Sequence, residues 1–423
     1  MTAYQSWRKL SYSDRATLLR KVAALMREDS DNLGKLLTDE MGKPVREAKG
    51  EVAKCAGCYE YYADNAEKFL APQSLESDAE RSWVQYSPLG PILGILPWNA
   101  PFWLFARVAA PALMAGNVVL IKHDPNVPGC ATGMAEVFHK AGFPEGVLQV
   151  LLLETPAVEP VIRDRRVRAV SFTGSTRGGA AVASIAASEI KPAVLELGGS
   201  DPCIVCADAD LDRAADTAVL SRFINAGQSC IAAKRILVEE SIYDDFVQRL
   251  KTRVEALKMG DPVLETTDCG PMARHDLRDQ LAAQVAATIK EGAKCLVGGA
   301  VPEQKGCWYP PTLLIDVTPA MTAFREETFG PVMAVVKVKD TEQAVELGND
   351  TEYGLAGSVW SSDITKAEAI AERLECGQVA INGIVKTDPR LPSGGIKRSG
   401  YGRELGPQGL LEFVNTKQMW VKR

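Results

Sequence analysis

Residues 168–199, RAVSFTGSTRGGAAVASIAASEIKPAVLELGG, decide the fold of this chain. The stretch starts with a short β-branched and aliphatic run, turns at Gly174, passes through small residues with a helical pattern, and ends in a second apolar run at 193–197. Strand, helix and strand in this order form the repeating unit of a parallel sheet that helices cover. The stretch therefore predicts a doubly wound α/β sheet.

The same alternation extends in both directions from this unit. Apolar runs that predict strands stand before and after it, at 91–96, 117–122, 148–153, 234–240, 332–338, 357–362 and 378–382. Helical patterns separate these runs, and the first seventy residues are predicted to be helical because apolar residues recur there every three to four positions. Since 423 residues exceed one compact core, we expect two α/β domains, the second starting near residue 200.

The composition is that of a globular protein and argues against several classes of function. Hydrophobic residues make up 46% of the chain and charged residues 24%, and the net charge is −6, so a nucleic-acid partner is not expected. The N-terminus lacks a signal-peptide pattern, and no apolar run is long enough to span a bilayer, so we expect a cytoplasmic protein without membrane contact. The ten cysteines are expected to be reduced.

Two cysteine pairs have the Cys-x-x-Cys spacing that suits zinc or redox chemistry, Cys55 with Cys58 and Cys203 with Cys206. The first pair lies in a helical pattern and the second in an apolar strand, and no histidine is near either pair. The three histidines form no metal-binding motif. We therefore expect these cysteines to pack in the core, and we predict no metal site.

Several candidate side chains stand where predicted strands end, which is where open α/β sheets bind their ligands. Glu196 lies in an apolar strand before two glycines, so it is either a general base with a raised pKa or a buried carboxylate held by backbone amides. Asn99, in PWNAPFW, is an oxyanion donor or a turn residue. Cys230, in NAGQSCIAAKR, stands instead before the predicted strand at 234–240, and it is a nucleophile or a core thiol. Gly174 and the glycines after it form a phosphate-binding turn or a purely structural one.

Five motifs stand in the order and at roughly the intervals of one family: PWN at 97–99, GSTRGG at 174–179, LELGG at 195–199, GQSC at 227–230 and EETFGPV at 326–332. Together they resemble the NAD(P)-dependent aldehyde dehydrogenase superfamily over essentially the whole chain. Glu196 and Cys230 lie 34 positions apart (230 − 196), similar to the family's spacing of base and nucleophile. Other stretches resemble the bacterial succinate-semialdehyde dehydrogenases of this superfamily, among them ALKMGDP at 256–262 and GRELGPQGLLEFVN at 402–415.

The resemblance implies an aldehyde dehydrogenase-like α/β fold with two doubly wound Rossmann-like domains and a β arm for oligomerisation. Residues 1–69 and 89–198 are expected to bind the cofactor, and residues 199–404 to form the catalytic domain. Residues 70–88 and 405–423 are expected to be the oligomerisation strands of a homodimer or homotetramer. Members of the family usually have a further segment before the first long helix, so the cofactor domain is expected to be shortened at its N-terminus.

The resemblance also implies a catalytic set. Cys230 would attack the aldehyde carbon as a thiolate, and Asn99 and the Cys230 N–H would hold the oxyanion that forms. Glu196 would activate the water that hydrolyses the resulting thioester. A cysteine-dependent thiol hydrolase without redox activity is the alternative from another class, but it needs a base such as histidine, and no histidine lies in a recognisable motif.

The cofactor-binding positions follow from the same resemblance: Trp98, Lys122, Gly174, Ser175, Gly179, Glu327 and Phe329. NAD is the favoured cofactor. NADP stays open because Pro125 stands where NAD-preferring relatives often carry a glutamate that repels the 2′-phosphate. His123 and Arg177 either help to bind that phosphate or face solvent.

Arg107 and Thr387 are the expected substrate-binding residues. Arg107 follows PWN on an apolar helix, and it either pairs with an unseen Asp or Glu or resembles the arginine that binds the distal carboxylate of semialdehydes. Thr387 would add a hydroxyl, and Ser393, where the family often has an aromatic residue, would leave the site more open and more polar. We therefore expect succinate semialdehyde as the substrate, with glutarate semialdehyde, a sulfonated aldehyde or a general aliphatic aldehyde as alternatives.

Overall fold

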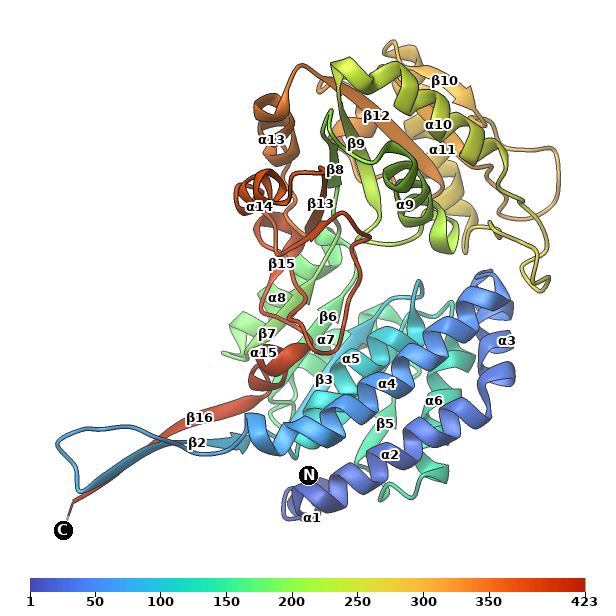
Figure 1. Ribbon diagram of the computed structural model, residues 1–423. Coiled ribbons are helices and arrows are strands. Elements are labelled where there is room, and N and C mark those ends of the chain that lie inside the picture. The colour runs from blue at the N-terminus through green and yellow to red at the C-terminus, as the bar shows by residue number, and fades with distance from the viewer. Residues whose placement is uncertain (423) are drawn as a thin grey trace.

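Three sheets organise the chain, of which the computed structural model describes residues 1–422 (Figure 1). A six-stranded sheet forms the lower body in the figure, a seven-stranded sheet forms the upper body, and a three-stranded arm projects to the lower left. The predicted α/β architecture with two doubly wound sheets is confirmed.

Four helices at the start of the chain realise the helical pattern of the first seventy residues: α1 Thr2–Trp7, α2 Tyr12–Glu28, α3 Ser30–Met41 and α4 Val45–Phe69. Ser11 begins α2 with a capping box, in which its hydroxyl accepts from the Asp14 N–H and the Asp14 carboxylate accepts from the Ser11 N–H. Gly42 ends α3 in the left-handed conformation at φ 77°. The inward faces of these helices pack into the same core as α5 Pro101–Met114 and α6 Pro128–Lys140.

The six-stranded sheet has the order β15-β7-β6-β3-β4-β5, in which β15 alone pairs antiparallel. Its strands are β3 Pro91–Leu96, β4 Val118–His123, β5 Leu148–Val150, β6 Ala169–Thr173, β7 Ala193–Glu196 and β15 Gly400–Tyr401. The helices that connect the parallel strands are α5 Pro101–Met114, α6 Pro128–Lys140, α7 Val158–Arg163, preceded by the short η1 Thr155–Ala157, and α8 Thr176–Ser188. The opening stretch 168–199 is thus the unit β6–α8–β7.

The seven-stranded sheet has the order β10-β11-β12-β9-β8-β13-β14, and only the edge strand β10 pairs antiparallel. Its strands are β8 Asp201–Val205, β9 Ala233–Glu239, β10 Lys294–Val297, β11 Thr312–Ile315, β12 Val332–Val338, β13 Ala356–Trp360 and β14 Gln378–Ile381. Its helices are α9 Leu211–Phe223, α10 Tyr243–Glu255, α11 His275–Lys290, α12 Thr322–Arg325, α13 Thr341–Asn349 and α14 Ile364–Glu372, with the single turns η2 Ile224–Gly227 and η3 Glu240–Ile242. The sequence analysis missed β10 and β11, which have only four residues each.

The projecting arm is built from parts of both predicted oligomerisation segments, 70–88 and 405–423. Strand β2 Arg81–Pro88 pairs antiparallel with β16 Val414–Val421 over their full length, and the short β1 Gln73–Ser74 adds to the other edge of β2. The chain's own tail therefore pairs with a strand of the same chain.

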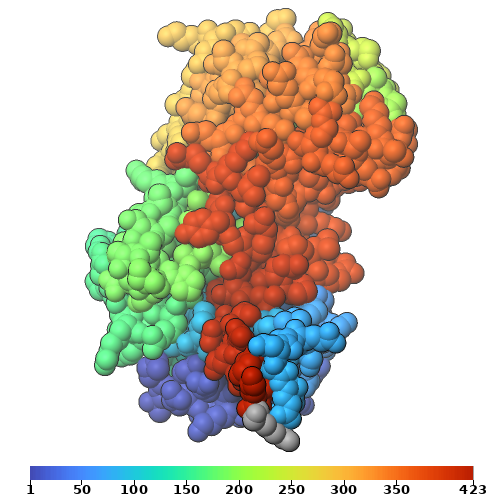
Figure 2. All heavy atoms as spheres, turned by 90° about the vertical axis from the view of Figure 1, so that its left-hand side faces the viewer, coloured from blue at the N-terminus to red at the C-terminus, as the bar shows by residue number. Residues whose placement is uncertain are grey.

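The chain crosses between the two bodies twice. It passes from β7 to β8 across 197–200, and it returns after β14 through η4 Lys397–Ser399 to β15 and then to α15 Gly406–Leu411. Figure 2 shows this C-terminal segment, in red, running down between the upper and lower bodies to the arm. Glu196, the last residue of β7, stands at the first of these crossings. No helix within residues 1–422 has the length and apolar character needed to cross a membrane.

Candidate active site

A left-handed turn presents Cys230. After α9, Asn225, Ala226 and Gly227 adopt positive φ angles of 56°, 51° and 70°. A Cβ on Gly227 would lie 2.3 Å from the carbonyl oxygen of Gly330, so glycine is required there by space as well as by conformation. The turn leaves Cys230 partly exposed at the base of β9.

A buried lysine fixes the backbone of Cys230. Lys234 Nζ donates to the carbonyl oxygens of Cys230 at 2.6 Å and Ser229 at 3.0 Å, and it lies 3.5 Å from Glu327 Oε1. Burial raises the pKa of the Cys230 thiol to about 11, although Lys234 and Arg107 pull it down. The thiol is therefore protonated at neutral pH, and a nearby base must accept its proton before it can attack.

Asn99 lies against the loop that carries Cys230. Its side-chain amide donates to the backbone carbonyl oxygen of Gln228 at 3.1 Å. The backbone carbonyl oxygen of Asn99 accepts from Asn225 Nδ2 at 2.8 Å and from Lys43 Nζ at 3.0 Å. The amide carries two hydrogens, so it can keep the contact with Gln228 and still donate to an oxyanion. This contact brings two predicted catalytic residues, 131 positions apart (230 − 99), to one place.

The sequence analysis missed the pair that supports Asn99. Glu51 on α4 forms a buried ion pair with Lys43, and its carboxylate accepts from the N–H groups of Phe102 and Trp103, each at 3.0 Å. Glu51 therefore satisfies the N-terminus of α5 directly after the PWN motif. A glutamate on the buried face of an amphipathic helix was the only signal for it in the sequence.

Glu196 ends β7 and is almost fully buried. Its Oε2 accepts from Arg107 Nη2 at 2.9 Å, and no hydrogen-bond donor in residues 1–422 contacts its Oε1. Burial raises the pKa of this carboxyl to about 7, with Arg107 lowering it and Glu404 raising it. A carboxylate with this pKa is suited to accept protons at neutral pH.

The structure shows which carboxylates surround Arg107. The sequence left open whether this arginine pairs with an Asp or Glu of the protein or binds the substrate, and its guanidinium lies between two buried carboxylates, Glu196 and Glu404. Glu404 follows β15 and pairs with Arg107 Nε, while Ser393 Oγ accepts from Nη2 at 3.4 Å. Arg107 therefore takes part in ion pairs within the protein, which was one of the two alternatives. Ser393, which was expected to leave the site more open, is buried and contacts Arg107.

Thr387 contacts a second cation of this region, Lys54. Its hydroxyl oxygen accepts from Lys54 Nζ at 2.7 Å and from Trp103 Nε1 at 2.9 Å. Trp103 and Arg107 are four residues apart on α5 and so share one face of that helix. Thr387 therefore lies at the face of α5 that carries Arg107, and its role toward the substrate stays a prediction; the sequence analysis missed Lys54.

The predicted cofactor residues gather at the carboxyl ends of β3, β4 and β6. The Trp98 ring meets the Phe329 ring edge-on with centroids 5.9 Å apart. Lys122 lies in β4 beside Ile95 of β3, and no carboxylate of residues 1–422 forms an ion pair with its buried side chain. Glu327 Oε1 accepts from the Gly199 N–H at 3.0 Å, on the side of the site where Lys234 lies.

The turn into α8 leaves its helix N-terminus uncovered. Ser175 caps α8 by accepting from the Gly178 N–H at 3.2 Å. A Cβ on Gly174 or Gly178 would meet the Phe172 ring at 2.8 Å, and one on Gly179 would meet Leu197 at 2.5 Å. An open helix N-terminus beside an unpaired lysine and a partly exposed glutamate fits a phosphate-bearing dinucleotide with ribose hydroxyls.

The two side chains considered for the NADP phosphate lie in different surroundings. His123 is buried against Phe105, with ring centroids 5.9 Å apart, and burial lowers the pKa of its imidazole to about 3. It is therefore neutral, and the expectation that it faces solvent is wrong. Arg177, in the first turn of α8, is exposed, and so is Pro125.

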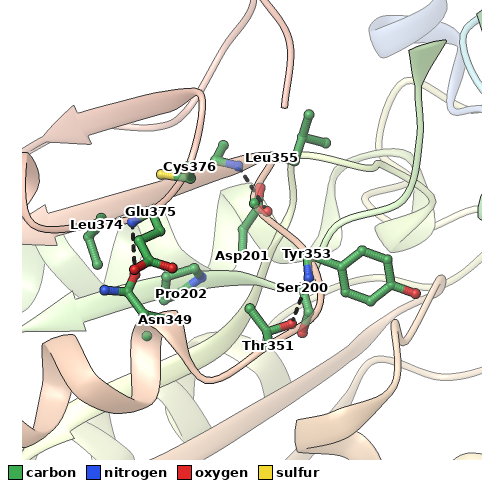
Figure 3. A pocket seen from close by; sticks show the side chains of 13 residues that line it. Ser200, Asp201, Pro202, Asn349, Thr351, Tyr353, Leu355, Leu374, Glu375 and Cys376 are labelled. Atoms are coloured by element: carbon green, nitrogen blue, oxygen red, sulfur yellow. Dashed lines mark hydrogen bonds between the residues drawn. The ribbon is translucent and has the colours of Figure 1, made fainter. Parts of the chain in front are cut away.

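The small cavity in Figure 3 lies outside this catalytic set. It has a volume of about 10 Å³, room for roughly one water molecule, and Ser200, Asp201 and Tyr353 are among its lining residues. Gly199 separates Asp201 from the Cys230 loop, because a Cβ there would lie 2.8 Å from Asp201 Oδ1 and 2.9 Å from the Cys230 carbonyl oxygen. A larger cleft of about 390 Å³ lies between the end of α3 and the segments 262–273 and 306–308, and none of the predicted site residues lines it.

Comparison with known proteins places the chain among enzymes of one family. The sequence profile of the aldehyde dehydrogenase family matches residues 1–419. A probable succinate-semialdehyde dehydrogenase [NADP(+)] of Synechocystis sp. is 50% identical over 418 residues, which are 99% of this chain and 92% of the relative. The succinate semialdehyde dehydrogenase [NAD(P)+] Sad of Escherichia coli K12 is 46% identical over 420 residues, 99% of this chain and 91% of the relative.

A solved structure agrees with these relatives. The succinic semialdehyde dehydrogenase of Streptococcus pyogenes, in complex with NADP+, is 36% identical and has a TM-score of 0.97 with this chain. The match covers 100% of this chain and 93% of that one.

Proposed function

This chain belongs to the aldehyde dehydrogenase family, and we propose that it oxidises succinate semialdehyde to succinate with NADP+ or NAD+. The observation that carries the proposal is the meeting of a thiol, an amide and a carboxyl group with a pKa of about 7, supplied by Cys230, Asn99 and Glu196. These are the three groups that thioester formation and its hydrolysis require.

The reaction uses these groups in turn. Glu196 accepts the thiol proton, and Cys230 sulfur attacks the aldehyde carbon, while the Asn99 amide and the Cys230 N–H donate to the oxyanion that forms. When bound, the nicotinamide supplies the acceptor for the substrate's hydride. Glu196 releases the thiol proton to solvent and then, as a carboxylate again, takes a proton from water, whose oxygen attacks the thioester carbon. The C–S bond breaks, the sulfur takes the proton back from Glu196, and the carboxylic acid and the thiol are released. A raised pKa suits Glu196 to both proton transfers.

The cofactor is held by residues of this chain that surround the α8 N-terminus. The N–H groups there would contact the pyrophosphate, Lys122 and Glu327 would contact ribose hydroxyls, and Trp98 with Phe329 would form an apolar wall. Because Pro125 offers no carboxylate, nothing at that position repels a 2′-phosphate. The relatives named for NADP(+) or NAD(P)+ support acceptance of NADP, whereas the resemblance of subgroup motifs favoured NAD.

We further propose a role for each part of the chain. Residues 1–69 and 89–198 bind the cofactor, residues 199–404 carry the nucleophile, and residues 70–88 with 405–423 join subunits in a homodimer or homotetramer. The outer edge of β16 has no partner strand within residues 1–422 and supports such a contact. Light scattering at micromolar concentration tests the assembly, and a monomer would contradict it.

All ten cysteines are free, which supports a reducing, cytoplasmic location.

The experiment for the reaction follows reduced cofactor by absorbance with succinate semialdehyde and either NADP+ or NAD+. The Cys230→Ala variant should form no reduced cofactor. Glu196→Gln tests the base, and it should give at most one equivalent of reduced cofactor per subunit and then stop at the thioester. Steady turnover by the Gln variant would remove Glu196 from the hydrolytic step. Ester cleavage by the wild type without any cofactor reduction would favour a thiol hydrolase instead.

A further inference from the structure

Arg222 joins two segments of the upper body through their backbone carbonyls. It lies in the last turn of α9, and its side chain is fully buried. Its guanidinium donates to four backbone carbonyl oxygens, those of Gly227 at 3.3 Å, Thr328 at 2.7 Å, Gly330 and Val332. The first belongs to the left-handed turn that presents Cys230, and the other three belong to residues 326–332, here called the EETFGPV segment.

Arg222 forms no ion pair within residues 1–422, and its four acceptors are all neutral. Burial lowers the pKa of its guanidinium, and the carboxylates whose charges act in the opposite direction are Glu327 and Asp201. A guanidinium has five N–H groups in a planar fork, so it can donate to several carbonyls at once. The fork is therefore used here to hold backbone and not to neutralise an acid.

Each of the two segments carries a part of the proposed reaction. The left-handed turn stands shortly before Cys230, and Thr328 stands between Glu327 and Phe329, which are proposed to contact the cofactor. The segments also touch directly, because a Cβ on the glycine of the turn would lie 2.3 Å from a carbonyl oxygen of the EETFGPV segment. Arg222 therefore lies where the nucleophile and the cofactor residues meet.

The turn has further supports that do not involve Arg222. The backbone N–H of Asn225 donates to the Glu47 carboxylate at 2.7 Å, and the Asn225 side chain donates to the Asn99 carbonyl oxygen at 2.8 Å. The contact of the turn with Arg222, at 3.3 Å, is the longest of the four that the guanidinium makes. Loss of Arg222 should therefore leave Cys230 in place and release mainly the EETFGPV segment.

We propose that Arg222 is a positioning residue, which holds the EETFGPV segment so that Glu327 and Phe329 lie correctly against the nucleophile turn. The proposal rests on the proposed oxidation with NADP+ or NAD+ and adds a residue that acts on it through backbone carbonyls. Loss of Arg222 should weaken cofactor binding and slow hydride transfer, while the reactivity of the Cys230 thiol without cofactor stays the same.

Arg222→Lys is the variant that tests this role. Lysine keeps the charge but has one nitrogen in place of a three-nitrogen fork, so it cannot hold the same set of carbonyls. We expect the Kd for NADP+, measured by quenching of tryptophan fluorescence, to rise roughly 10-fold, as for one lost hydrogen bond to a charged group. The burst of reduced cofactor with succinate semialdehyde should slow. Alkylation of Cys230 by iodoacetamide without cofactor, followed by mass spectrometry, should keep the wild-type rate.

Arg235→Lys is the matched control. Arg235 in β9 is also fully buried and forms no ion pair within the described part of the chain, and it donates to three backbone carbonyls, those of Ser200, Leu347 and Gly348, each at 2.8 Å. None of these carbonyls lies in the turn or in the EETFGPV segment. Arg235→Lys should therefore lower Tm, as Arg222→Lys does, and keep the wild-type Kd for NADP+.

The outcomes separate this proposal from the proposed function. If the wild type binds NADP+ but reduces none with succinate semialdehyde, the proposed function fails, and the binding and alkylation measurements still decide the role of Arg222. A wild type that binds no NADP+ would contradict both proposals. If Arg222→Lys keeps the wild-type Kd, if Arg235→Lys shows the same loss, or if binding and alkylation fall in parallel, Arg222 has only a structural role.

Folding of the variants is checked by circular dichroism. If Arg222→Lys does not fold, Arg222→Gln replaces it in the same measurements, because its neutral side chain buries no charge. An unchanged Kd for NADP+ in Arg222→Gln would overturn the proposal. Failure of both variants to fold would also overturn it, because Arg222 would then serve folding alone.

Discussion

Arg107 donates a 2.9 Å hydrogen bond to the carboxylate of Glu196, with both side chains buried. The same guanidinium pairs on its other side with Glu404. The pKa of Glu196, the proposed catalytic base, is therefore raised by burial and adjusted by two opposing neighbours, a cation that lowers it and an anion that raises it.

Replacing Glu404 should make the enzyme active at lower pH. In Glu404→Gln, the negative charge that raises the pKa of Glu196 is gone, while Arg107 remains to lower it. The base works as a carboxylate, so activity rises with pH through its pKa, and a lower pKa moves this rise toward acid. The Gln side chain can still accept from Ser171 Oγ, which contacts Glu404 at 3.2 Å. A kcat profile from pH 5 to 9 measures the shift, and a rise at the same pH as in the wild type would contradict it.

The buried pair below the PWN segment should contribute strongly to stability. Glu51→Gln leaves the Lys43 ammonium buried without its counter-ion, so we expect a loss of about 3–5 kcal/mol, measured by urea unfolding with tryptophan fluorescence. Glu60→Gln is the control, because Glu60 pairs with Arg27 on the surface, where an ion pair contributes about 0–1 kcal/mol. Equal losses for the two variants would show that the Lys43–Glu51 pair has no special role.

The left-handed turn before the nucleophile should not tolerate a side chain. In Gly227→Ala, the new Cβ would lie 2.3 Å from the Gly330 carbonyl oxygen in a conformation with φ +70°. We expect lost activity and a lower Tm, since the turn that presents Cys230 must move. Gly50→Ala on α4 provides the contrast: nothing lies within 4 Å of a Cβ there, and a helical Ala should stabilise by about 0.5–1 kcal/mol.

Removing the Asn99 amide should slow the chemistry and leave cofactor binding intact. Asn99→Ala loses the donor to the oxyanion, so kcat should fall on the order of 10²- to 10³-fold. Affinity for NADP+, measured by quenching of tryptophan fluorescence, should not change, because Asn99 contacts the Cys230 loop rather than the α8 turn. A variant with wild-type kcat would exclude Asn99 as an oxyanion donor.

The sequence by itself determined the doubly wound sheets and their catalytic motifs. One local alternation of apolar and small residues predicts β6, the Gly174 turn, α8 and β7. A central parallel strand is buried on both faces, so nearly every side chain in it is apolar. Cys230, Glu196 and Asn99 could be proposed because each stands in a short motif, Glu196 and Asn99 where β7 and β3 end and Cys230 before β9 begins. The edge strand β10 and its neighbour β11, of four residues each, were missed in the sequence.

The tertiary structure alone decided which charges are free. Arg107 appeared unpaired in sequence because its partners lie on β7 and beyond β15. Hydrophobic patterning repeats within a few residues, whereas a buried ion pair joins side chains from distant segments whose meeting depends on how whole elements pack. Which anion a buried cation such as Arg107 pairs with is therefore decided by packing.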